Sequence, residues 1–157
     1  MTEQAQTRRL QDTLTIAGSA VVAFSVWSLA KIGMFLKFAD KDVLSWLLGL
    51  DEESLTIAVY VSLIVVALVD VSVRAYVGMS ARAEGRGVRK GPFYLVVAAI
   101  VAIANALSLA GIALSASFAL SPLSMIIPVL IEATAIAALV LVIRSSLRLR
   151  RASETAE

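Results

Sequence analysis

Apolar residues run along this chain in four long stretches, at about residues 13–36, 55–77, 93–116 and 124–143. Each stretch has about 20 residues or slightly more, which is enough for an α-helix to cross about 30 Å of hydrocarbon. Charged residues collect in the tails and loops between the stretches. The pattern predicts an all-α integral membrane protein, in which residues 1–157 form a single membrane domain: an antiparallel bundle of four transmembrane helices.

The distribution of basic residues predicts how the four spans are oriented. Basic side chains cluster before the first stretch, in an inner loop at 78–92 and in a tail at 144–157, whereas the outer loop at 37–54 carries more acidic than basic residues. Basic segments stay on the cytoplasmic side of a membrane. We therefore expect a multi-pass protein of the cell membrane, such as a bacterial inner or plasma membrane, with both the N and the C terminus in the cytoplasm.

Three polar residues fall at membrane depth in three different stretches. Glu132 lies near the middle of the fourth stretch, where an unpaired carboxylate is costly, and Asn105 lies at nearly the same depth in the third. Lys31 lies in the outer third of the first stretch, about 6 Å from Glu132 along the membrane normal, a distance that a lysine side chain covers. We expect a buried Lys31–Glu132 pair with Asn105 as a third member, which either fixes helix packing or binds a substrate or ion.

Asp70 and Arg74 form a second polar feature, in the inner half of the second stretch. Their i,i+4 spacing places both on one helix face, with the acid on the N-terminal side, which is the favourable order. The pair either satisfies Asp70 as a structural ion pair or acts as a gate in a polar path. Arg74 is also near enough to the end of its span for its side chain to reach water.

Small residues repeat along one face of the third stretch, at Ala98, Ala102, Ala106 and Ala110, with Gly111 beside them. Close helix approach in membranes depends on such residues, because lipid supplies no hydrophobic force between helices. The stripe predicts that this helix is the crowded centre of the bundle, or alternatively that it makes a contact between copies of the chain.

Composition excludes much of the chemistry that the polar residues would otherwise suggest. The chain contains no Cys and no His, and its formal net charge is only +2. It contains no HExxH, GxSxG or phosphate-loop motif and no cluster of metal ligands. We therefore expect no enzyme activity and no catalytic residue, no metal or other cofactor, and no nucleic-acid partner.

Two functions remain open on the sequence alone. The first is a small transporter or channel subunit with a polar site near the membrane midplane, formed by Glu132, Asn105 and Lys31. The second is a non-transporting assembly or regulatory subunit that acts through helix–helix contacts. In either case we expect the lipid bilayer as the surroundings and a homo-oligomer or another membrane subunit as the partner, because four helices seldom enclose both a pathway and a gate.

Overall fold

The computed structural model describes residues 3–38, 52–116 and 123–154, and these segments fold into long helices. The helices are α1 (Glu3–Phe38), α3 (Glu52–Gly85), α4 (Phe93–Ala116) and α5 (Leu123–Glu154). All four are long and apolar enough to cross a membrane, and the described residues contain no strand. The predicted all-α fold is therefore confirmed, and it indicates a multi-pass membrane protein.

The helices extend beyond the apolar stretches that predicted them. The sequence assigned 78–92 to a loop, but α3 continues to Gly85, because residues 78–85 pack against the N-terminal part of α1. Likewise, the predicted tail at 144–157 is helical as far as Glu154. Most of the predicted outer loop at 37–54 lies outside the described residues.

The connection between α3 and α4 is short because α3 ends in a tight hydrogen-bonded turn. The N–H of Gly87 donates to the carbonyl of Glu84, and the N–H of Val88 donates to the carbonyl of Ala83. Gly87 has a φ of 87°, the left-handed conformation that glycine adopts without strain at a helix end. The turn satisfies the last carbonyls of α3 and brings the chain directly to the start of α4.

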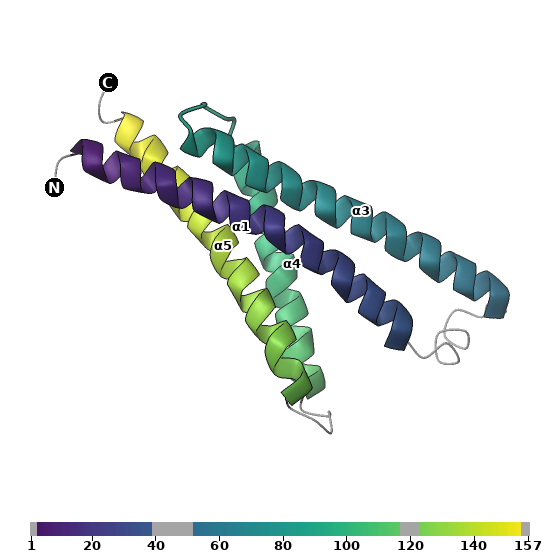
Figure 1. Cartoon of the computed structure of the whole chain (residues 1–157). Coiled ribbons are helices and arrows are strands. Elements are labelled where there is room, and N and C mark those ends of the chain that lie inside the picture. Colours follow the sequence, from purple (N-terminus) through teal and green to yellow (C-terminus); the bar gives the residue numbers. More distant parts are fainter. Residues whose placement is uncertain (1–2, 39–51, 117–122, 155–157) are drawn as a thin grey trace.

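The four helices meet at one end and separate toward the other, so that the molecule has the shape of a V (Figure 1). At the joined end lie the starts of α1 and α4 and the ends of α3 and α5. Helix α1 packs against both α3 and α5, α4 packs mainly against α5, and α3 and α4 contact each other less. One arm of the V is therefore the α1–α3 pair, and the other arm is the α4–α5 pair.

The buried core lies in the half of each helix nearest the joined end. Its apolar members include Leu14, Val21, Val77, Tyr94, Ala98, Leu139 and Val142. In the separated halves, the described side chains of residues 57–66 and 106–111 are almost all exposed. In a bilayer, lipid tails would be as apolar as these side chains, so no hydrophobic force would close the two arms. Among the side chains that the structure describes, the packing of the predicted bundle is thus concentrated at the joined end.

Two glycines that lie outside the predicted alanine stripe provide a close contact between α1 and α3. A Cβ atom built on Gly18 of α1 would lie 2.7 Å from the carbonyl oxygen of Gly78 in α3, and one built on Gly78 would lie 2.5 Å from the carbonyl oxygen of Gly18. No side chain fits at this crossing. Of the stripe, Ala98 is fully buried and Ala102 is partly buried, whereas Ala106 and Ala110 are exposed because they lie beyond the joined half of α4.

Candidate functional site

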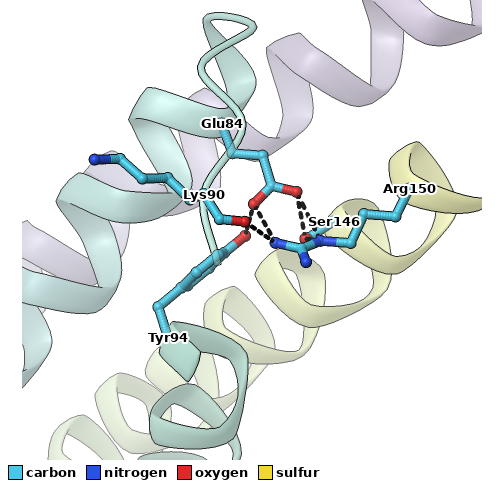
Figure 2. A network of polar contacts seen from close by, with 5 residues as sticks. All are labelled: Glu84, Lys90, Tyr94, Ser146 and Arg150. Atoms are coloured by element: carbon cyan, nitrogen blue, oxygen red, sulfur yellow. Dashed lines mark hydrogen bonds and ion pairs between the residues drawn. The ribbon is translucent and has the colours of Figure 1, made fainter. Parts of the chain in front are cut away.

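Two groups of buried polar side chains lie at different levels of the V. The first is at the joined end, where Glu84 of α3 is only 5% exposed and accepts hydrogen bonds from two other helices (Figure 2). Tyr94 donates its hydroxyl to Oε2 at 2.7 Å, and Ser146 donates its hydroxyl to Oε1 at 2.8 Å. These bonds join the end of α3 to the start of α4 and to α5.

Arg150 of α5 completes this group, which we call the joined-end network (Glu84, Lys90, Tyr94, Ser146 and Arg150). Its Nε donates to Oε1 of Glu84 at 3.0 Å, and its Nη2 donates to Oε2 at 2.9 Å. The same Nη2 donates to the backbone carbonyl of Lys90 at 2.8 Å. The guanidinium neutralises the buried carboxylate and also fastens the loop between α3 and α4 to α5 (Figure 2).

Sequence reasoning missed the joined-end network, because Glu84 was assigned to a charged loop. A signal was nevertheless present in the spacing of the buried residues. Arg74, Val77, Ala81 and Glu84 recur at helical intervals, and all four are buried on the same side of α3. Extending that pattern past Val77 would have placed Glu84 inside the helix and in the core.

The second group lies nearer the middle of the V and is centred on Arg74 of α3, which is only 5% exposed. Its Nε donates to both carboxylate oxygens of Asp70, at 3.0 and 2.9 Å. Its Nη2 donates to Oδ1 of Asn105 in α4 at 2.8 Å. The i,i+4 ion pair that the sequence suggested is present, but Arg74 is held between helices and does not reach out to water.

Asn105 therefore lies against Arg74, a contact that its depth had not suggested, and its place beside a Lys31–Glu132 pair stays a prediction. The orientation of its amide follows from chemistry: arginine can only donate, so the atom that faces Arg74 must be the oxygen. Nδ2 then faces the other way. It is buried and makes no hydrogen bond in the described part of the chain.

Glu132 of α5 is also buried, with 2% of its surface exposed. Lys31 belongs to α1, but its side chain lies outside the described part of the structure, so the Lys31–Glu132 pair stays a prediction. At a rise of 1.5 Å per residue, Arg74, Asn105 and Glu132 lie about 15, 17 and 21 Å along their helices from the joined-end network. These distances are comparable with half the thickness of a hydrocarbon layer of about 30 Å, and we call Asp70, Arg74 and Asn105 the midplane group.

The chemistry of this midplane group is that of buried charge and hydrogen-bond donation. The described residues contain no set of three acidic side chains, or of other ligands, that could hold a metal ion. Asp70 retains 31% exposure of its side chain, so the edge of the group reaches the surface between the two arms or the surrounding lipid. Comparison of the chain with protein-family models, curated proteins and solved structures found no match in any of the three.

Proposed function

We propose that this chain is a small transporter or channel subunit, whose polar site lies where the two arms of the V separate. The observation that carries the proposal is the arginine at half membrane depth: Arg74 is almost fully buried and is bound to Asp70 and to Asn105 of another helix. Ionisable side chains at this depth are costly and commonly mark substrate or ion pathways. The buried Glu132 adds a second ionisable group at a similar depth.

The shape of the molecule supports the same proposal. The joined-end network and the Gly18–Gly78 contact hold the helices together at one end, while the other ends are apart. Helices that are joined at one end and separate at the other are compatible with the alternating access of a carrier. The positive-inside rule assigns the joined end to the cytoplasm, so this form would be open outward.

Flux measurements on the purified protein in liposomes test the proposal. A panel of sodium, potassium, chloride and proton gradients is applied, and flux is followed with ion-selective fluorescent dyes. We expect flux of at least one ion, and a lower rate for Glu132→Gln in liposomes that contain the same amount of folded protein. Flux that Glu132→Gln leaves unchanged would remove Glu132 from the pathway.

A second function is favoured by the exposed separated halves. Residues 57–66 and 106–111 present apolar and small side chains on nearly every side, a surface that another membrane subunit could cover. The protein would then act as an assembly or regulatory subunit without transporting anything. Absence of flux across the whole panel, together with a defined oligomer or hetero-complex after cross-linking in the membrane, would favour this function over transport.

A further inference from the structure

The C-terminal part of α5 has two different faces. Its inner face packs into the core through Ser146, and Arg150 on that side has Glu84 as its carboxylate partner. Arg144 and Arg148 are exposed, and neither makes a hydrogen bond or ion pair with another residue that the structure describes. The described part of the chain therefore neutralises one arginine of this segment and leaves these two without a counter-charge.

Arg144 and Arg148 lie one turn apart on the outer face of α5. Their i,i+4 spacing places both on the same side of the helix, where two like charges repel each other. An anion between the two guanidinium groups would remove the repulsion and accept charge-assisted hydrogen bonds from both. Leu141, which is 47% exposed, lies on the same face one turn nearer the middle of the helix. The face thus suits an anion that carries an apolar part.

The depth of the two arginines matches that of lipid headgroups. Arg144 and Arg148 lie about 18 and 24 Å beyond Glu132 along α5, at a rise of 1.5 Å per residue. Since Glu132 is near the middle of its apolar stretch, the hydrocarbon ends about 15 Å from it and the headgroups occupy roughly the next 5–8 Å. Side chains on a helix lean toward its N-terminus, so Arg148 leans back toward the headgroups. Both guanidinium groups are therefore within reach of a headgroup phosphate.

We propose that Arg144 and Arg148 form a binding site for an anionic phospholipid, whose phosphate lies between the two guanidinium groups and whose acyl chains pack beside Leu141. The site is on the outer face of α5, so it does not depend on whether the protein transports anything. Other exposed side chains at the joined end add to the positive potential there, since Arg8, Arg9, Arg86, Arg89, Lys90 and Arg151 are basic, whereas Asp12 is acidic (Figure 1). Basic clusters next to a membrane span attract anionic lipids in general, and α5 adds a pair that can hold one headgroup.

Competition between two lipids tests the proposal. The purified protein in a neutral detergent is mixed with equal amounts of phosphatidylglycerol and phosphatidylcholine that have the same acyl chains, and the lipid that stays bound is counted by native mass spectrometry. Both lipids carry a phosphate, but only phosphatidylglycerol has a net charge. We expect the protein to retain phosphatidylglycerol at least about tenfold better than phosphatidylcholine.

Two double variants separate a paired site from general attraction. Arg144→Gln combined with Arg148→Gln should lower the preference for phosphatidylglycerol about tenfold. Arg8→Gln combined with Arg9→Gln is the matched control, because it removes the same charge from exposed positions at the same end of the molecule. Adjacent residues on a helix do not face each other and so cannot share one phosphate, and the control should lower the preference by less than about threefold.

Arg148→Lys covers the case in which the Arg144 and Arg148 double variant does not fold. Lysine keeps the charge but lacks the planar fork of arginine donors, so the preference should fall about threefold, and an unchanged preference would overturn the proposal. Equal retention of the two lipids by the unaltered protein would also overturn it, as would a loss in the control double variant that equals the loss in the α5 variant. Displacement of the bound lipid by excess inorganic phosphate would likewise refute it, because the arginine pair would then bind free phosphate rather than a headgroup.

Discussion

Removal of the Glu84 carboxylate tests whether the joined-end network holds the two arms of the V together. Glu84→Ala takes the acceptor away from Tyr94, which is 1% exposed, and from Ser146, which has no exposed surface. A buried hydroxyl that loses its partner costs about 1–3 kcal/mol. Arg150 adds little to the loss, because 28% of its side chain is exposed and water can replace the carboxylate.

Two hydroxyls at that cost predict a fall of about 2–6 kcal/mol in the free energy of unfolding for Glu84→Ala. Glu84→Gln keeps one acceptor oxygen and should lose about half as much. Asp12→Ala is the matched control, because it removes an exposed carboxylate from the same end of the molecule and should change stability little.

The assay is reversible unfolding of the purified protein in mixed micelles with increasing mole fraction of a denaturing detergent, followed by circular dichroism. A parallel measurement, the distance between spin labels at exposed positions 57 and 126 in the separated halves, reports whether the arms move. Equal stability of Glu84→Ala and Asp12→Ala would refute the reasoning, since it would mean that water replaces the joined-end network at no cost.

Three further predictions concern other parts of the molecule. Gly78→Ala should lower the free energy of unfolding by about 1–2 kcal/mol in the same assay, because overpacking outweighs the gain in helix propensity. Gly111→Ala is the control: its Cβ meets no atom within 4 Å, so it should raise the free energy of unfolding by up to about 1 kcal/mol. A stabilised Gly78→Ala variant would contradict the close crossing of α1 and α3. Arg74→Lys keeps the charge but cannot bind both of its partners, and should lower the free energy of unfolding by about 1–3 kcal/mol; unchanged stability would mean that the midplane group contributes nothing to folding. The chain has no cysteine, so the single variants Arg86→Cys and Arg151→Cys can each be labelled with a membrane-impermeant thiol reagent in intact cells and in inverted vesicles. Both cysteines should react only in the vesicles, and labelling of the two from opposite faces would disprove the predicted topology.

Hydropathy alone predicted the helices, because in lipid the backbone must form its hydrogen bonds within each span. It ended the second helix too early at Val77, since residues 78–85 include two glycines and the charged residues Arg82 and Glu84, although the segment packs against α1. The V shape had no signal in the sequence. Apolar side chains in lipid gain nothing from facing one another, so hydropathy does not distinguish a helix that is packed along its whole length from one that is packed along half of it.

The polar residues of the midplane could be found from depth, but their partners could not. Counting residues along each span placed Asn105 at nearly the same depth as Glu132, and placed Arg74 nearer the cytoplasm. It could not show that Asn105 lies against Arg74, because that depends on how α3 and α4 are rotated about their axes. The contact between Gly18 and Gly78 was overlooked for a related reason. The two glycines lie on different helices, and the sequence does not show where those helices cross.

The joined-end network also constrains the order in which the protein is made. Ser146 and Arg150 follow Glu84 by 62 and 66 residues, so the carboxylate leaves the ribosome well before these two of its partners. At about 5–20 residues per second, the wait is roughly 3–13 s. During that interval the carboxylate of Glu84 lacks its guanidinium partner, and the joined-end network is completed only when synthesis of the last helix is nearly finished.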